Sequence, residues 1–325
     1  MLSLPDNPRI LVIRGGAIGD FILTLPAIGA LRQRWPSARL EILGYPRIAA
    51  LADGRYYADA VRSIDAAAMA RFFTPEADLD PSLAGYFASF DLVLSYLYDP
   101  DDIFSANLRR AGVRRLLFAS AKPDREHAAT HFARPLAELG LRAEPQHPRV
   151  FPNAADRAFA ESFFSEHASR FTLHASRPTP NAPRPLALHP GSGGEHKVWP
   201  ADRWAAVIQW LQQQAGCDIL LIGGEADAEA RRLLAPLDLP VAWNLPLPQL
   251  AAVLEHCALF AGHDSGITHL AAAAGIPTLA LFGPTSPDIW TPLGPRVRVV
   301  TAGGAMDTLG VETVIAALRE MLSEK

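Results

Sequence analysis

The sequence is poor in cysteine and lysine. Its 325 residues include two cysteines, Cys217 and Cys257, which show no metal-ligand spacing and imply no disulfide framework. Its three lysines, Lys122, Lys197 and Lys325, stand beside 27 arginines. A lysine in a chain that otherwise uses arginine hints at a specific role. Lys197, which ends a glycine-rich stretch, is therefore a candidate functional residue.

Long apolar runs are also missing. The longest, 270–282, is interrupted by Gly275 and Pro277, and the N-terminal stretch has only a four-residue apolar run before its glycines. The sequence therefore predicts neither a membrane span nor a signal peptide, and we expect a cytoplasmic protein. The net charge is −4, and residues 161–325 carry 11 basic against 16 acidic side chains. We expect no nucleic-acid partner, and an anionic partner would meet the first half.

The chain opens with a strand at 9–13, a glycine loop at 14–20, a helix at 21–35 and a second strand at 40–43. This order predicts a βαβ unit. A dinucleotide site is disfavoured because the glycines fall at 15, 16 and 19 and the second strand ends without an acidic residue. A Gly-Lys-Ser/Thr phosphate loop is absent from the sequence.

Strands and helices keep alternating along the chain, as in Rossmann-like domains. Residues 168–185 break this pattern, because they are rich in proline and lack apolar periodicity. We place a linker at 169–185, between an N-terminal domain at 1–168 and a C-terminal domain at 186–325. The predicted fold class is α/β.

The stretch 259–287 holds two strand-to-loop turns. A buried strand at 259–261 leads through polar residues to a helix that starts near Ser265. The first amide groups of a helix have no partner within it and favour an anion such as phosphate. Ser265 and Thr268 offer hydroxyl groups, and Gly266 allows a close approach. Alternatively, Asp264 or Ser265 only caps the helix.

Three loops of the second half should meet above one parallel sheet, since each follows a strand: 191–197, 223–225, and 264–269 with 283–285. Such a crevice suits a nucleoside diphosphate. Lys197, Ser192 and Thr285 would contact phosphate oxygens, and Glu225 would accept hydrogen bonds from ribose hydroxyls. In the alternative interpretation, Lys197 is a solvated loop charge.

Asp20 stands where the first glycine loop becomes a helix. It is either a helix cap or a carboxylate that serves as the general base for a sugar hydroxyl. The Asp99-Pro-Asp101 stretch matches a metal-binding pattern of glycosyltransferases, but a turn and helix cap explain it more simply, and we predict no metal site. The string 262–266 resembles a serine-protease motif without supplying Gly-x-Ser-x-Gly.

Nearly the whole chain resembles glycosyltransferase family 9, the ADP-heptose lipopolysaccharide heptosyltransferases and their relatives. The motifs are Arg14-x-x-x-x-Gly19-Asp20 with Thr24-Leu25-Pro26, His189-Pro190-Gly191 with Lys197-x-Trp199-Pro200, Asp264-Ser-Gly266-x-x-His269, and Phe282-Gly283-Pro284-Thr285. This resemblance implies the GT-B architecture, with two Rossmann-like domains facing across a cleft. The N-terminal domain would be the acceptor-binding one and the C-terminal domain the nucleotide-sugar-binding one. It also implies an inverting, metal-independent glycosyltransferase without a cofactor, with Asp20 as base and Lys197 stabilising the leaving diphosphate.

The resemblance and the loop pattern together give the predicted site. The donor-binding residues are Ser192, Gly193, Lys197, Gly224, Glu225, Asp264, Ser265, Gly266, Thr268, His269, Gly283 and Thr285. The acceptor, a glycan or a lipid-linked molecule that would bring the protein to the inner membrane face, would meet Arg14, Arg47 and Arg55. The sequence departs from the family at Gly15-Gly16 and at 286–290, which leaves the donor sugar open. Rival functions also stay open. These are a nucleotide-sugar-binding module without catalysis, or a GT-B enzyme, such as an epimerase or a transferase, that uses a UDP- or GDP-sugar.

Overall fold

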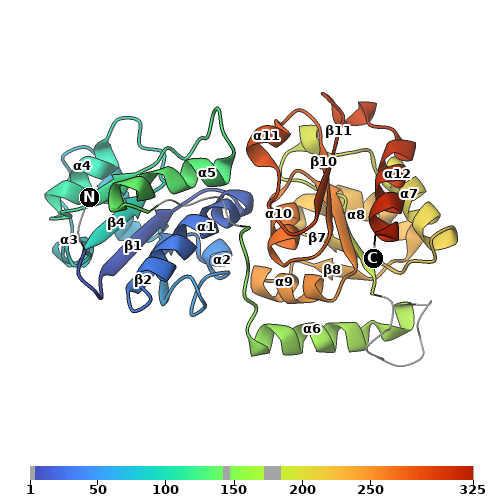
Figure 1. The fold of residues 1–325 in the computed structure, drawn as a ribbon, viewed down its shortest axis with the longest axis horizontal. Helices are drawn as coiled ribbons and strands as arrows, with labels where there is room; N and C mark the ends of the chain where they lie inside the picture. Colours follow the sequence, from blue (N-terminus) through green and yellow to red (C-terminus); the bar gives the residue numbers. More distant parts are fainter. Residues whose placement is uncertain (1–3, 142–146, 172–183, 325) are drawn as a thin grey trace. The chain divides into compact units, whose positions relative to one another are not determined.

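The computed structural model describes residues 4–141, 147–171 and 184–324. The chain forms two compact units, Met1–Phe151 and Pro152–Lys325, each built on its own parallel sheet (Figure 1). The predicted α/β class with two Rossmann-like domains is confirmed. No helix in the described ranges is long and apolar enough to cross a membrane.

The first unit contains a five-stranded sheet in the order β3-β2-β1-β4-β5. Every strand pair in it is parallel, so each connection must cross over the sheet. The elements follow in the order β1 (Arg9–Arg14), α1 (Ile18–Arg34), β2 (Arg39–Gly44), α2 (Pro46–Ala49), β3 (Ala60–Ser63), η1 (Ala67–Phe73), α3 (Pro81–Ala88), β4 (Leu92–Ser95), α4 (Ile103–Arg110), β5 (Leu116–Phe118), α5 (Ala128–Ala133) and η2 (Arg134–Leu139).

Both faces of this sheet are buried, as expected for parallel strands covered by helices. On one face, Leu11 and Val93 pack against aromatic side chains of η1, α3 and α4, among them Phe72, Phe87 and Phe104. Alternate residues of β1, such as Ile10 and Val12, are fully buried as well. This burial on both faces explains why the strands consist of consecutive apolar residues in the sequence.

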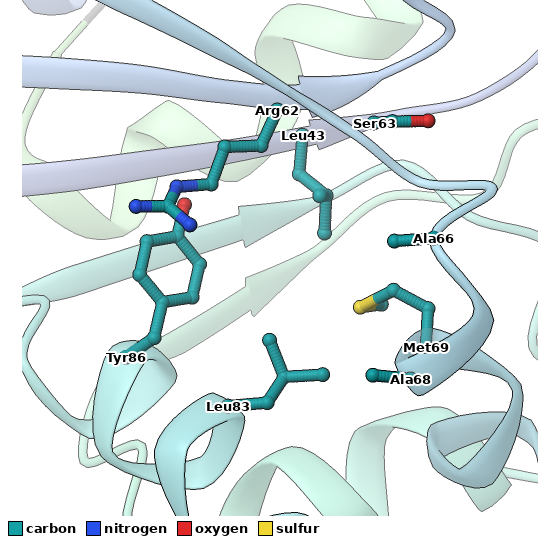
Figure 2. Close-up of a pocket in the computed structure, with 8 residues that line it drawn as sticks. All are labelled: Leu43, Arg62, Ser63, Ala66, Ala68, Met69, Leu83 and Tyr86. Carbon is teal, nitrogen blue, oxygen red and sulfur yellow. The ribbon is translucent and has the colours of Figure 1, made fainter.

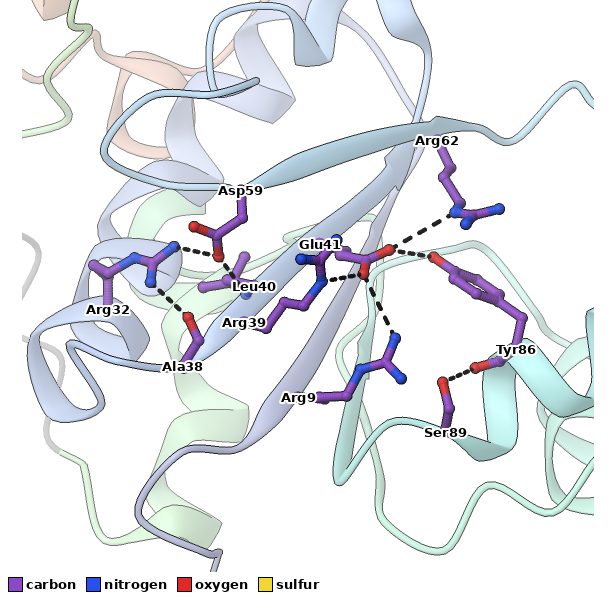
Figure 3. Close-up of polar contacts among 10 residues, drawn as sticks. All are labelled: Arg9, Arg32, Ala38, Arg39, Leu40, Glu41, Asp59, Arg62, Tyr86 and Ser89. Atoms are coloured by element: carbon purple, nitrogen blue, oxygen red, sulfur yellow. Dashed lines mark hydrogen bonds and ion pairs between the residues drawn. The ribbon is translucent and has the colours of Figure 1, made fainter.

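One buried carboxylate interrupts the apolar sheet (Figure 3). Glu41 of β2 contacts Arg39 at 3.0 Å, Arg9 at 3.6 Å and Arg62 at 3.7 Å, and it accepts a hydrogen bond of 3.2 Å from the Tyr86 hydroxyl. Burial, together with the Glu41 charge, raises the pKa of Tyr86. A buried charge is tolerated when it is paired in this way.

The second unit contains a six-stranded parallel sheet in the order β11-β10-β9-β6-β7-β8. A helix, α6 (Ala154–Glu166), and a short turn, η3 (Ala168–Arg170), precede the sheet. The remaining elements are β6 (Leu186–His189), η5 (Glu195–Lys197), α7 (Ala201–Gln213), β7 (Ile219–Gly223), η6 (Glu225–Asp227), α8 (Ala228–Leu234), η7 (Ala235–Leu237), β8 (Val241–Trp243), α9 (Leu247–Glu255), β9 (Leu259–His263), α10 (Gly266–Ala273), β10 (Thr278–Phe282), α11 (Pro287–Trp290), β11 (Val297–Thr301), η8 (Met306–Thr308) and α12 (Val311–Ser323).

Helix α6 belongs to the second unit, although it falls within the N-terminal domain predicted at 1–168. It packs against α9, with an ion pair of 3.1 Å between Arg157 and Glu255 and the rings of Phe164 and His256 5.4 Å apart. The division at Phe151/Pro152 therefore precedes the expected boundary at 168. Most of the predicted linker, 172–183, lies outside the described residues, so its role stays a prediction.

Some elements have no clear signal in the sequence. The strands β3 and β8 contain three or four residues and are only partly buried, which leaves them without a clear apolar run. The helical segment that begins at Ala128 is divided into α5 and η2 around Pro135, because proline cannot donate the hydrogen bond that continues an α-helix.

Candidate functional site

The candidate site lies in the second unit, at the carboxyl ends of β6 and β9. These strands are neighbours at the point where the strand order reverses, and open parallel sheets bind ligands at such points. The loop after β6 contains Ser192 and leads to Lys197, and the loop after β9 contains Asp264 and Ser265. The topology therefore brings two of the predicted loops to one edge of the sheet.

Ser265 is the N-cap residue of α10, and the helix start predicted there is confirmed. Its backbone is extended and its hydroxyl accepts a hydrogen bond of 3.4 Å from the amide of Thr268. Thr268 is fully buried, and its own hydroxyl donates to the carbonyl of His263. Thr268 thus holds the turn together, while the amides of Gly266 and Ile267 begin the helix.

Asp264 joins three of the predicted residues. Its Oδ2 atom lies 2.8 Å from the Nζ atom of Lys197 and accepts a hydrogen bond of 2.7 Å from the Thr285 hydroxyl. The Ser192 hydroxyl donates to its backbone carbonyl at 3.3 Å. The Asp264 side chain is 7% exposed and that of Lys197 26% exposed. Lys197 is therefore a fixed charge beside the start of α10 rather than a solvated loop charge.

His263, at the end of β9, holds the loops in place. Its Nε2 atom accepts hydrogen bonds from the Trp199 amide at 2.9 Å and from the Trp204 indole at 3.2 Å. Because Nε2 accepts, Nδ1 carries the proton and donates to the Gly191 carbonyl at 2.9 Å. Burial lowers the pKa of His263 to about 4, so the ring is neutral at pH 7.

His189 and Asp227 form a second support, and neither is among the predicted donor-binding residues. The His189 Nε2 atom lies 3.2 Å from Asp227 Oδ2, and the same oxygen accepts from the Gly224 amide at 2.8 Å. A Cβ atom on Gly191 would lie 1.6 Å from Asp227 Oδ1, so only glycine fits there. The signal for this support is an aspartate three residues after Gly224, the spacing of a capping box.

The other predicted donor residues occupy different surroundings. Glu225 is exposed, and its amide donates to the Asn244 side chain at 3.0 Å, while Gly193 borders open space. A Cβ atom on Gly283 would meet Met306 Sδ at 2.6 Å, so this glycine serves close packing. His269 is buried in α10. Contact of these residues with a donor stays a prediction.

In the first unit, Asp20 lies in the first turn of α1. Its Oδ2 atom accepts a hydrogen bond of 3.0 Å from the Ala17 amide, and its Oδ1 atom is 3.4 Å from the guanidinium of Arg14. The Asp20 side chain remains 23% exposed. The carboxylate is therefore a helix cap that solvent still reaches, and the cap alone does not use all of its lone pairs. Its role as a base stays a prediction.

Arg14 is almost completely buried behind Asp20. Its guanidinium carbon lies 4.4 Å from the centre of the Phe132 ring and 5.6 Å from that of Tyr96. Burial lowers the pKa of Arg14, and the Asp20 carboxylate opposes that change. An arginine buried this deeply is better placed to orient Asp20 than to contact an acceptor in solvent.

The other predicted acceptor residues lie elsewhere. Arg47 is exposed in α2, and Arg55 donates to the carbonyls of Ala50 at 2.8 Å and Asp53 at 2.9 Å.

Asp99 accepts hydrogen bonds from the first amides of α4, those of Phe104 at 3.0 Å and Ser105 at 2.8 Å. The predicted capping role of Asp99 is therefore confirmed.

A separate hollow of about 230 Å³ opens in the first unit (Figure 2). Its walls come from β2, β3, η1 and α3, and Figure 2 shows the side chains of Leu43, Met69 and Leu83 pointing toward it. The guanidinium of Arg62 lies over the ring of Tyr86 at 4.3 Å on one side. None of the predicted acceptor arginines lines this hollow.

Comparison with known protein families identifies the chain. The model of glycosyltransferase family 9 (heptosyltransferase) matches residues 113–313, which include every predicted donor-binding residue. The chain belongs to glycosyltransferase family 9. It is accordingly an enzyme that uses a nucleotide-sugar donor and a glycan acceptor. Asp20 lies outside the matched range.

Relatives extend the similarity to nearly the whole chain. Lipopolysaccharide heptosyltransferase 3 of Escherichia coli strain K12 is 25% identical over 94% of this chain and 96% of its own length. Among solved structures, a glycosyltransferase family 9 protein from Veillonella parvula superposes with a TM-score of 0.80 at 20% identity, covering 98% of each chain. The E. coli ADP-heptose lipopolysaccharide heptosyltransferase II gives a TM-score of 0.72 at 18% identity, covering 97% of this chain and 98% of that one. These structures share the fold of the family 9 chain described here.

Proposed function

We propose that this family 9 glycosyltransferase moves a heptose from ADP-heptose onto a hydroxyl group of a lipopolysaccharide-type or other glycan acceptor. The names of its relatives support this choice of donor, and the relative that covers 94% of the chain is a lipopolysaccharide heptosyltransferase. The structural observation that carries the proposal is the Lys197 ammonium group, fixed by Asp264 beside the start of α10.

The leaving diphosphate would bind at this place. Transfer breaks the bond between the anomeric carbon and a phosphate oxygen, so negative charge grows on the diphosphate in the transition state. The ammonium group of Lys197 and the first amides of α10 stabilise that charge without a metal ion. The hydroxyl groups of Ser192 and Thr285 already point at Asp264 and can turn to phosphate oxygens.

Asp20 would act as the general base. Its carboxylate takes the proton of the acceptor hydroxyl as the oxygen attacks the anomeric carbon from the side opposite the diphosphate, which inverts the configuration. The hydrogen bond from Ala17 and the Arg14 guanidinium fix the orientation of the carboxylate. General-base catalysis of this kind contributes about 10²- to 10⁴-fold to a rate.

A lipid-linked acceptor would bring the enzyme to the cytoplasmic face of the inner membrane. Flotation with vesicles that contain the acceptor tests this localisation. Binding that disappears when the acceptor is omitted supports contact through the substrate, and absence of binding to acceptor-containing vesicles contradicts it.

The donor is tested by thermal-shift titration with ADP-, GDP- and UDP-sugars, followed by a transfer assay with a heptose-free lipopolysaccharide acceptor. The proposal predicts stabilisation by ADP-heptose and a heptosylated product detected by mass spectrometry. Binding without transfer to any acceptor would favour the module without catalysis. Preferential binding of a UDP- or GDP-sugar would overturn the choice of donor and leave the family unchanged.

A further inference from the structure

A histidine beneath the start of α10 connects a carboxylate to the N-cap hydroxyl. His189 Nε2 lies 3.2 Å from Asp227 Oδ2, and its Nδ1 atom lies 3.4 Å from the Ser265 hydroxyl oxygen. His189 is 3% exposed and Asp227 9% exposed. The three side chains come from β6, η6 and the residue before α10, so the tertiary fold, rather than local sequence, brings them together.

The positions of the protons in this chain follow from the available donors. An ionised carboxylate only accepts hydrogen bonds, so His189 carries a proton on Nε2 and donates it to Asp227. Burial alone would raise the pKa of Asp227, but the His189 ring and the Gly224 amide more than compensate and lower it, which keeps the carboxylate ionised. In a neutral His189, Nδ1 is therefore an acceptor, and among the described residues the Ser265 hydroxyl is its hydrogen-bond partner.

The single hydroxyl proton of Ser265 is then committed within the protein. It points either to His189 Nδ1 at 3.4 Å or to the Thr268 hydroxyl oxygen at 3.1 Å, and Thr268 gives its own proton to the His263 carbonyl. If Ser265 donated to a phosphate oxygen instead, the buried Nδ1 atom would face only oxygen lone pairs. Leaving a buried acceptor unsatisfied costs about 1–3 kcal/mol.

A second proton on His189 removes this conflict. Nδ1 then donates to a lone pair of Ser265, and the Ser265 hydroxyl is released to donate to a bound anion. We propose that binding of the donor diphosphate at Ser265 is coupled to uptake of a proton by His189. This inference rests on the proposed function, because it takes the diphosphate to bind at the start of α10.

Other charged and titratable groups around His189 do not take over this role. His263, on the neighbouring strand β9, is held neutral by burial, which lowers its pKa to about 4. Asp264 is already paired with Lys197 at 2.8 Å. Arg231 of α8 borders the small cavity beside Asp227 and lies over the Trp243 ring at 4.4 Å. Asp227 is the carboxylate in direct contact with His189, so it stabilises the added charge.

The coupling fixes the sign of the pH dependence. A second proton gives the His189 ring a positive charge beside Ser265, where it attracts the negative charge of a bound diphosphate. Because binding then consumes a proton, donor affinity rises as the pH falls. The slope reaches at most about tenfold in Kd per pH unit for one proton.

Isothermal titration calorimetry with ADP-heptose measures the proton directly. Its diphosphate is a diester, so the ligand itself takes up no proton near neutrality. Titrations in buffers with different ionisation enthalpies, repeated from pH 6 to pH 9, give the number of protons taken up. We expect uptake approaching about one proton in the wild type within this range.

Three variants identify the group. His189→Gln retains an amide donor for Asp227 and should show no proton uptake and a flat affinity profile. Asp227→Asn should shift the uptake to lower pH. The matched control is His256→Asn, which removes an exposed histidine at the end of α9, near the amino ends of the strands, and should behave like the wild type.

The results separate this inference from the proposed function. Wild-type binding without proton uptake at any pH from 6 to 9 overturns the coupling and leaves the donor site standing. Uptake that persists in His189→Gln assigns the proton to another group and also overturns it. Absence of ADP-heptose binding at every pH overturns the donor site and the coupling together.

Discussion

The carboxylate of Asp264 holds the ammonium group of Lys197 at 2.8 Å, although the two residues are 67 positions apart in the chain. This ion pair joins the loop after β6 to the loop after β9. It fixes a positive charge next to the N-cap of α10 before any ligand binds, and such preorganisation is what stabilises charge in a transition state.

Substitution of Lys197 by methionine removes this charge and retains most of the side-chain volume. Loss of a charge-assisted hydrogen bond, worth about 1.5–3 kcal/mol, should weaken donor affinity and kcat/KM together by roughly 10- to 100-fold. Calorimetry and a coupled ADP-release assay measure both values. Lys122→Met, at an exposed lysine in the first unit, is the matched control. Donor affinity that is unchanged in Lys197→Met would remove Lys197 from the diphosphate site.

Substitution of Asp20 by asparagine should lower kcat by roughly 100-fold or more, because an amide cannot accept the proton of the acceptor hydroxyl. Donor affinity should stay the same, and the amide oxygen can still accept the Ala17 hydrogen bond. Asp80→Asn is the control, since Asp80 caps α3 through a 2.8 Å bond from the Leu83 amide and should affect stability alone. Equal turnover in Asp20→Asn and wild type would exclude Asp20 as the base.

His263 should make folding stability depend on pH. Its pKa is about 4 in the folded protein, whereas an unfolded histidine titrates near 6.5, so the unfolded chain binds more protons between these values. The contribution of His263 to the free energy of unfolding is complete above about pH 6.5 and is lost as the pH falls toward 4. Its total is roughly 3 kcal/mol.

Urea unfolding at pH 7 and pH 5 tests this dependence. The wild type should lose more stability between the two pH values than His263→Gln, which keeps a polar side chain without a titrating ring. A His263→Gln variant with the same pH dependence as the wild type would show that other groups cause the loss.

Gly191 should tolerate no side chain. An alanine Cβ there would lie 1.6 Å from Asp227 Oδ1, so Asp227 and the loop must move apart. We expect Gly191→Ala to lower the free energy of unfolding by about 1–3 kcal/mol and to weaken nucleotide binding. Gly193→Ala, two residues further on, points into open space and should leave the unfolding temperature unchanged. Equal unfolding temperatures for the two variants would contradict the close packing of Asp227 against the loop.

The sequence predicted the parts of the site that depend on local order. Strand β9, the helix start at Ser265 and the glycine loops follow from apolar runs and capping residues within short segments. The topology could also be inferred, because alternating strands and helices lead to parallel sheets whose loops meet at one edge.

The supports behind the site could not be predicted in the same way. The register of β6 with its neighbours brings together His189, Asp227 and His263. In the sequence, no local pattern shows which partners a buried histidine at a strand end will contact. The choice between a solvated Lys197 and a paired one likewise depends on a partner 67 residues away. Interactions of this kind depend on tertiary geometry.

A transfer assay with ADP-heptose, a heptose-free lipopolysaccharide acceptor and the chelator EDTA tests the central claim most directly. The account predicts that the wild type releases ADP and forms heptosylated acceptor in equal amounts, that the product has the inverted configuration, and that Lys197→Met and Asp20→Asn form it far more slowly. A wild-type enzyme that binds ADP-heptose but forms no product, or a Lys197→Met enzyme as active as the wild type, would contradict it.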